Sequence, residues 1–128
     1  MAVPTDNPAV QDFAVATNAD LNAPCLIQDQ NRVGVDLAGA SLAMDIKESI
    51  DGAAILSLSS ASTTGNGSGL SVTSAAEGAF TIDIKKADFA ALSFGDRSAI
   101  AGFYDITRTV SGETIRLVKG QITISKGV

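Results

Sequence analysis

The sequence contains no histidine and no tryptophan, and only one of its 128 residues is a cysteine. Histidine is the commonest acid-base group near neutral pH and the commonest metal ligand, so catalytic pairs such as Ser-His and Cys-His are excluded. The single cysteine, Cys25, excludes a disulfide within the chain. Because Cys25 lies beside apolar residues and has no histidine to pair with, we expect a small buried side chain rather than a nucleophile.

Aromatic residues make up only 5% of the chain, whereas hydrophobic residues make up 45%. A core must therefore be packed mainly with aliphatic side chains and five phenylalanines, and the length suits one domain. No apolar run approaches the length of a membrane span, and the first residues lack the basic segment and apolar stretch of a signal peptide. We therefore expect a protein that is made in the cytoplasm and kept there unless lysis releases it, with no membrane partner.

Basic residues are in the minority, with nine against fourteen acidic residues and a formal net charge of −5. This balance argues against a nucleic-acid partner. The charge is also uneven, since the chain up to Asn31 has four acids and no base, whereas the chain from Arg108 onward has four bases and one acid. Chance spread over a solvated surface explains this pattern, and so does head-to-tail contact between identical subunits that uses Arg108, Arg116 and Lys119.

Alternation of apolar and polar residues predicts about eight short β-strands. The clearest case is a hairpin from Ala101 to Ile124, in which Ser111-Gly112 forms a two-residue turn. Its apolar positions change phase after Leu117, and we place the slip at Gly120, where a strand can bulge or bend. The other predicted strands lie in residues 12–17, 25–28, 33–37, 42–46, 54–58, 70–72 and 80–84, with a short hairpin formed by residues 25–28 and 33–37.

Only residues 85–92 are expected to form a helix, because Phe89 and Leu92 share one face and a glycine follows soon after. Short strands separated by turn signals, with one short connecting helix, are typical of an all-β antiparallel sandwich. Residues 1–11 contain two prolines and no periodicity. We expect them to be an extended N-terminal arm, followed by a single β-sandwich domain over residues 12–128.

Two segments are candidates for contact with a partner protein. Residues 59–69 (SSASTTGNGSG) have the composition of a flexible loop, which is either a plain connector or a contact loop. The N-terminal arm would be ordered by a neighbouring copy of the chain. The candidate interaction residues are Val3, Pro4, Asp6 and Pro8 in the arm and Thr64, Asn66 and Ser68 in the loop.

Acidic residues are the only groups that offer metal or catalytic chemistry. The possible oxygen ligands for Ca²⁺ are Asp29 with Asn31 and Asp36, and Asp45 with Asp51. Neither group has the spacing of a calcium loop, and turn or cap roles explain the same residues. A hydrolase that uses carboxylates would need two acids converging in one cleft. We expect no cofactor, no metal and no small-molecule substrate, and we expect Asp105 to face solvent or a partner.

Three segments resemble the small Ig-like β-sandwich proteins of tailed bacteriophages, a likeness that covers about residues 33–126. They are VDLAGASLAMDIK at 35–47, GAFTIDIKKADFAAL at 78–92 and AGFYDITRTVSGETIRLVKGQITIS at 101–125. The second stands where that family carries a G-x-hydrophobic-x-I-x-I-P-A-x-D-x-A-x-L stretch, with Lys86 in place of the proline. In the third, the residues that fit the family's hairpin loosely are Gly102, Tyr104, Asp105 and Gly120.

The resemblance implies an Ig-like fold and a non-enzymatic structural protein of the virion. Some members of that class look like tail-collar or baseplate adaptors to which fibres attach, and others look like cement proteins that decorate a capsid. We favour the tail, with capsid decoration as the alternative and a carbohydrate- or receptor-binding module as a further alternative. The expected partners are copies of the chain itself and other virion proteins, bound through apolar patches, paired strand edges and the ordered arm.

Overall fold

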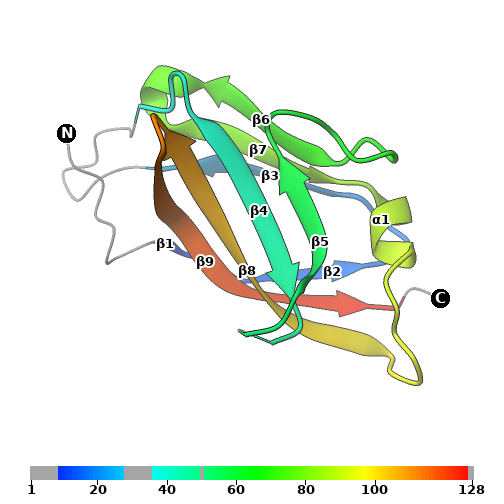
Figure 1. The fold of residues 1–128 in the computed structure, drawn as a ribbon. Coiled ribbons are helices and arrows are strands. Elements are labelled where there is room, and N and C mark those ends of the chain that lie inside the picture. Colours follow the sequence, from blue (N-terminus) through cyan, green and yellow to red (C-terminus); the bar gives the residue numbers. More distant parts are fainter. Residues whose placement is uncertain (1–8, 28–35, 50, 127–128) are drawn as a thin grey trace.

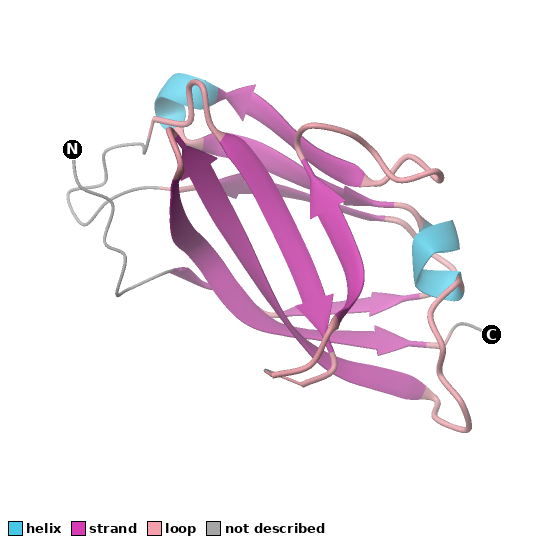
Figure 2. Cartoon of the chain, viewed as in Figure 1, coloured by secondary structure: helices cyan, strands magenta, loops and turns pink. Residues whose placement is uncertain are grey.

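The computed structural model describes residues 9–27, 36–49 and 51–126, which form two facing β-sheets (Figures 1 and 2). The strands of this part of the chain are β1 (Ala9–Val10), β2 (Phe13–Ala16), β3 (Leu21–Leu26), β4 (Ser41–Lys47), β5 (Ala54–Ser59), β6 (Gly69–Ser74), β7 (Ala79–Ile84), β8 (Ala99–Val110) and β9 (Glu113–Ser125). A 3-10 turn, η1 (Ala75–Glu77), precedes β7, and one short helix, α1 (Lys86–Ala90), follows it. No described helix is long and apolar enough to cross a membrane.

The strand order is that of an Ig-like sandwich, so the predicted fold class is confirmed. One sheet, called sheet A, has the order β1-β9-β8-β4-β5, with β2 also paired to β9. The other, sheet B, has the order β3-β7-β6. The two sheets correspond to the G-F-C-C′ and B-E-D strands of an Ig domain. Only β1 and β2 depart from antiparallel pairing, because both run parallel to β9.

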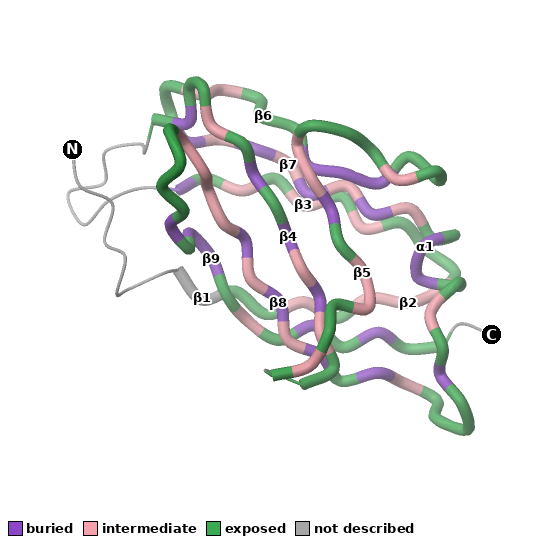
Figure 3. Tube along the Cα trace, in the orientation of Figure 1, coloured by how far each residue is buried: buried purple, intermediate pink, exposed green. Residues whose placement is uncertain are grey.

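The core lies between the sheets and consists mainly of aliphatic side chains, as the composition predicts. Alternate residues of the central strands are buried and the residues between them are more exposed (Figure 3). Since successive side chains of a strand lie on opposite faces, the buried set is the one that faces the other sheet. The largest fully buried side chains are Phe80, Phe89, Leu37, Leu42, Met44, Ile46, Ile82, Ile84, Ile100, Ile106, Ile122 and Ile124. Burial of each such side chain contributes about 1.5–3 kcal/mol relative to exposure, so these two inner faces hold the sheets together.

The predicted hairpin is present as β8 and β9, and Ser111 and Gly112 both have positive φ angles of 52° and 81°. Positive φ at both central residues is the geometry of a tight hairpin turn. The predicted position of the phase slip is wrong. Ile106 pairs with Val118 but Thr107 pairs with Arg116, so the extra residue is Leu117. Leu117 and Val118 are both buried, and the bulge lets consecutive residues face the core.

Gly120 has a different role, because its lack of a side chain lets the backbone of Gln11 pass directly against it, a close approach that we call the crossing. β1 pairs with residues 118 and 119 and β2 with residues 122–125 in one continuous register, so the N-terminal chain runs along one side of β9 and Gln11 lies opposite Gly120. A Cβ at residue 120 would overlap the Gln11 carbonyl oxygen and approach Tyr104 Cε1 at 3.0 Å. Tyr104 lies across from Gly120 and donates its hydroxyl hydrogen bond to that same carbonyl oxygen. Burial raises the pKa of Tyr104, which keeps this donor protonated.

The parallel pairing also brings together the two oppositely charged ends of the chain. Gln11 N donates to Lys119 O at 3.0 Å, and Gln121 N donates to Asp12 Oδ1 at 2.9 Å. The acid-rich and base-rich segments are therefore neighbours within one molecule, and contact between subunits is not needed to explain their complementarity. The predicted boundary between arm and domain falls between β1 and β2, both of which belong to sheet A.

Each sheet edge in the described part of the chain is interrupted. β3 contains Pro24, which has no N–H to offer a further strand. β5 and β6 carry extra residues, Ile55 and Thr73, where their pairing registers shift. The β1-β2 edge is broken at residues 11–12. Such interruptions oppose edge-to-edge pairing, so the geometry disfavours the paired strand edges expected from the sequence.

Other local predictions had mixed outcomes. The strands expected at residues 12–17, 42–46, 54–58, 70–72 and 80–84 are present as β2, β4, β5, β6 and β7, and the expected helix is present as the shorter α1. The hairpin predicted for residues 25–28 and 33–37 begins within β3, which pairs with β7. Residues 28–35, which would complete that hairpin, lie outside the described residues.

We predict that Gly120→Ala lowers the free energy of unfolding by about 1–3 kcal/mol or more, because the new methyl group overlaps backbone that cannot move without displacing β1 and β2. Gly65→Ala is the matched control, since a Cβ there meets open space and the residue does not have positive φ. Denaturant unfolding of both variants gives the energies, and hydrogen exchange of residues 9–16 reports on the displaced strands. If Gly120→Ala and Gly65→Ala lowered the free energy of unfolding by the same amount, the close approach of Gln11 to Gly120 would be contradicted.

Candidate interaction surface

A broad depression of about 530 Å³ lies on the outer face of sheet A. Its lining comes from residue 12 and from strands β4, β8 and β9, and it combines the ring of Phe103 with charges of both signs. The lining residues are Asp12, Asp45, Lys47, Phe103, Tyr104, Asp105, Arg116, Lys119, Gly120 and Gln121. Six of these are charged, three acids and three bases, so the depression as a whole is close to neutral and suits a partner with both signs of charge.

The strand register fixes how the charges are arranged. Asp105 on β8 lies directly across from Lys119 on β9 and from Asp45 on β4. Arg116 Nε lies 3.4 Å from Asp105 Oδ2, and Ser57 Oγ donates to Asp45 Oδ1 at 2.8 Å. Two carboxylates thus stand side by side, as a carboxylate hydrolase would require, but each already has a partner within the chain. The prediction that Asp105 faces outward is confirmed.

The three predicted basic residues do not act together. Arg116 and Lys119 line the depression. Arg108 lies in the same phase as Ile106, and its Nη1 donates to the Asp36 carbonyl oxygen at 3.3 Å. Arg108 therefore serves the turn before β4 and takes no part in the depression.

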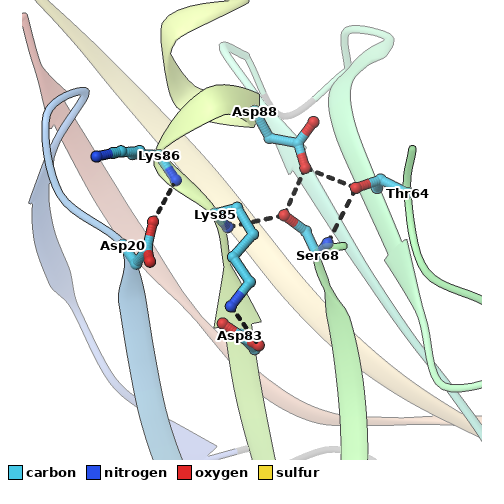
Figure 4. Close-up of polar contacts among 7 residues, drawn as sticks. All are labelled: Asp20, Thr64, Ser68, Asp83, Lys85, Lys86 and Asp88. Atoms are coloured by element: carbon cyan, nitrogen blue, oxygen red, sulfur yellow. Dashed lines mark hydrogen bonds and ion pairs between the residues drawn. The ribbon is translucent and has the colours of Figure 1, made fainter. Parts of the chain in front are cut away.

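The loop of residues 59–69 is fixed at its far end by Asp88 of α1 (Figure 4). Asp88 Oδ2 accepts hydrogen bonds from Thr64 Oγ1 at 2.7 Å and from Ser68 Oγ, and its Oδ1 accepts from Asn66 Nδ2 at 2.8 Å. Ser68 Oγ in turn accepts from Lys85 N at 2.8 Å, and Ser68 N donates to Thr64 Oγ1 at 3.0 Å. We call these four residues, Thr64, Asn66, Ser68 and Asp88, the Asp88 latch.

The latch corrects the interaction role predicted for the loop. Ser68 is fully buried and is not available to a partner. Thr64 is half-buried and Asn66 is exposed, but the side chains of both are committed to Asp88. The second half of the loop is thus an anchored turn rather than a flexible connector. Its composition is explained by the small hydrogen-bond donors that one carboxylate needs.

Asp88 is held in its charged form by these contacts. Burial opposes ionisation, but the hydrogen bonds from Ser68, Thr64 and Asn66 outweigh it and lower the pKa of the carboxyl. A lowered folded-state pKa stabilises the fold above the unfolded-state value, and the contribution is lost as the pH falls through the folded-state value.

Two further acids, Asp36 and Asp20, accept hydrogen bonds from backbone N–H groups. Asp36 Oδ1 accepts from Ala38 N at 2.9 Å, which confirms the predicted turn role, and Asp20 Oδ1 accepts from Lys86 N at 2.7 Å (Figure 4). Within the described residues, no three acids or cysteines are grouped as a metal site. Asp29 and Asn31 lie outside those residues, as do the arm residues Val3, Pro4, Asp6 and Pro8.

Cys25 is half-buried and packs against the core, close to its predicted environment. Its Sγ lies 3.7 Å from the Ala23 carbonyl oxygen. Burial raises the pKa of the thiol, so the residue remains protonated and weakly nucleophilic near neutral pH.

The sequence analysis did not single out four of the ten residues that line the depression, namely Asp12, Lys47, Phe103 and Gln121. Alternation along β4 and β8 predicts that Asp45, Lys47 and Phe103 face outward, so part of the signal was present. What alternation does not give is the order of the strands across the sheet. The contribution of Asp12 depends on the crossing at Gly120, which has no local signature.

We predict that Asp88→Asn lowers the free energy of unfolding at neutral pH by about 1–3 kcal/mol. The substitution replaces one carboxylate oxygen, which accepts hydrogen bonds, with an amide nitrogen that cannot accept them, so at least one donor of the latch loses its partner. The difference from the unsubstituted chain should narrow as the pH falls below about 4, where the carboxyl loses its charge. Denaturant unfolding at about pH 7 and about pH 3 measures both energies.

Asp96→Asn is the control for this substitution, since Asp96 is exposed in the turn after α1. It should leave stability unchanged to within about 0.5 kcal/mol at both pH values. A pH-independent loss in Asp88→Asn would mean that the latch acts through packing and not through the charge.

No protein-family model matches the chain, and no curated protein sequence matches it. Solved structures of similar fold include the ZIG-8-RIG-5 IG1-IG1 heterodimer, which is 12% identical, covers 100% of this chain and 90% of that one, and gives a TM-score of 0.47. The RIG-5 IG1 homodimer is 14% identical, covers 98% of this chain and 94% of that one, and gives a TM-score of 0.44. At such values the likeness concerns the fold alone, and the Ig-like assignment rests on the strand order of this chain.

Proposed function

We propose that this chain is a non-enzymatic structural protein of a tailed-phage virion, which assembles with copies of itself and binds neighbouring tail, baseplate or fibre proteins. The observation that carries the proposal is the depression on the outer face of sheet A. It combines a half-buried aromatic ring with charges of both signs, as protein-binding surfaces do. Assembly in the host cytoplasm belongs to the same proposal.

The sequence resemblance supports the phage origin, and the fold gives its segments a structural meaning. The segment at 78–92 forms β7 and α1, and it supplies the latch aspartate, Asp88. The segment at 101–125 forms the hairpin of β8 and β9, with Tyr104 and Gly120 at the crossing. These positions serve the fold, so they support membership of a structural class and not a reaction.

A carbohydrate-binding module is a second candidate, because Phe103 lies among polar groups in a shallow depression. An aromatic face flanked by carboxylates and an amide is the usual composition of a sugar site. Binding of a glycan that saturates, and that Phe103→Ala abolishes, would favour this function over the structural one.

We predict that antibodies raised against the purified chain label particles produced by the strain that encodes it. Gold particles at the tail tip or baseplate, seen by electron microscopy, are the expected result. Labelling spread over the head would instead support the capsid-decoration alternative. Intact particles without label, together with label in the soluble fraction of the lysate, would contradict a virion role. Pre-immune serum on the same particles is the control.

A further inference from the structure

We propose that two copies of this chain bind each other through the outer face of sheet A, in a twofold contact that sets Lys119 of each copy against Asp105 of the other. The inference rests on the proposed function, because it names the surface through which self-assembly begins. The argument comes from the placement of charges in and around the depression.

The charges on this face have opposite signs on the two sides of a line between β8 and β9. Lys119 on β9 lies directly across from Asp105 on β8. The neighbouring row of residues contains Gln121 on β9 and Phe103 on β8. In this row Asp12 lies next to Gln121, on the side of β9 away from β8, and Lys47 lies on β4, next to Phe103. Asp105 and Asp12 therefore each have a base in the matching place on the other side of the line, whereas the place that matches Asp45 is occupied by Val10.

A twofold axis along that line exchanges the two sides when a second copy is laid face to face with the first. Lys119 then meets Asp105 of the second copy, and Asp12 meets Lys47 of the second copy. Because the contact is isologous, each of these pairs occurs twice. The face is thus complementary to itself, and such complementarity fixes the register of the two copies and rejects other arrangements.

The carboxylates of Asp45 and Asp105 give a second reason for the contact. They lie directly opposite each other on neighbouring strands, and like charges in such pairs are unfavourable. Within one copy, Arg116 forms an ion pair with Asp105, and Lys119 lies across from it on β9. Lys119 of the second copy adds another positive charge beside this pair, and the contact also covers the half-buried ring of Phe103.

The alternative route to a dimer is pairing of exposed strand edges. Pro24, the extra residues Ile55 and Thr73, and the break at residues 11–12 interrupt the edges in the described parts of both sheets. A face-to-face contact needs no free backbone groups and is compatible with all four interruptions.

Charge exchange tests the contact. We predict that Lys119→Asp and Asp105→Lys each weaken the dimer by roughly tenfold or more, because each places like charges together twice. An equimolar mixture of the two variants should recover the dimer, since the acid pair of one variant then meets the base pair of the other. Sedimentation velocity over the micromolar range measures the masses. Association of the unsubstituted chain should weaken as salt is raised.

Lys86→Asp is the matched control, because Lys86 is exposed at the start of α1 and makes the same change of charge away from the depression. It should leave the dimer unchanged, and thermal unfolding of all three variants checks that each is folded. A dimer that tolerates both charge reversals, or a mixture that stays monomeric, would overturn the proposed contact.

A tryptophan probe gives an independent measurement, because the chain has no tryptophan of its own. In Phe103→Trp, emission should shift to shorter wavelength as the dimer forms, and an unchanged spectrum while the mass doubles would count against this face. A monomer at all concentrations whose antibodies still label particles would sink the contact and leave the virion role. If the mixture of Lys119→Asp and Asp105→Lys formed the dimer but antibodies did not label particles, the contact would stand and the virion role would be contradicted.

Discussion

Sheet A depends on the close approach of the Gln11 backbone to Gly120. The approach lets β9 pair along both of its sides, with β8 on one and with β1 and β2 on the other. Tyr104 fills the space beside the glycine and binds the carbonyl group that crosses it. The same crossing sets Asp12 next to Gln121 on the outer surface. Gly120 thus affects both faces of the sheet, because the same close approach positions Tyr104 in the core and Asp12 on the exposed face.

Carboxylates do much of the remaining structural work in this acidic chain. Asp12, Asp20 and Asp36 each accept a backbone N–H, and Asp88 gathers three side chains at the foot of β6. A thin core of aliphatic residues gives little control over loops, because apolar contacts are not directional. Charged hydrogen bonds are directional, and the four carboxylates supply such bonds at these loops and turns.

The fold could be predicted from the sequence where its signals are local. Alternation located β4, β7 and the hairpin of β8 and β9, because each residue's face follows from its neighbours. Gly120 and Ser68 were misread for the opposite reason. A glycine indicates freedom of the backbone but not the chain that crosses it, and a serine-rich loop indicates flexibility but not the distant Asp88 that binds it. The depression was predicted only in part, because its residues come from strands whose order across the sheet is set by the whole fold.

The Asp88 latch also divides the loop before β6 into two parts that differ in their tolerance of change. Thr64, Asn66 and Ser68 bind the helix, so the chain from residue 64 to β6 keeps its course whatever precedes it. Ala61 and Ser62 are exposed, and lengthening an exposed loop costs little free energy. The peptide bond between these two residues is therefore a natural place to graft a foreign epitope, which the sandwich would display without loss of its own architecture.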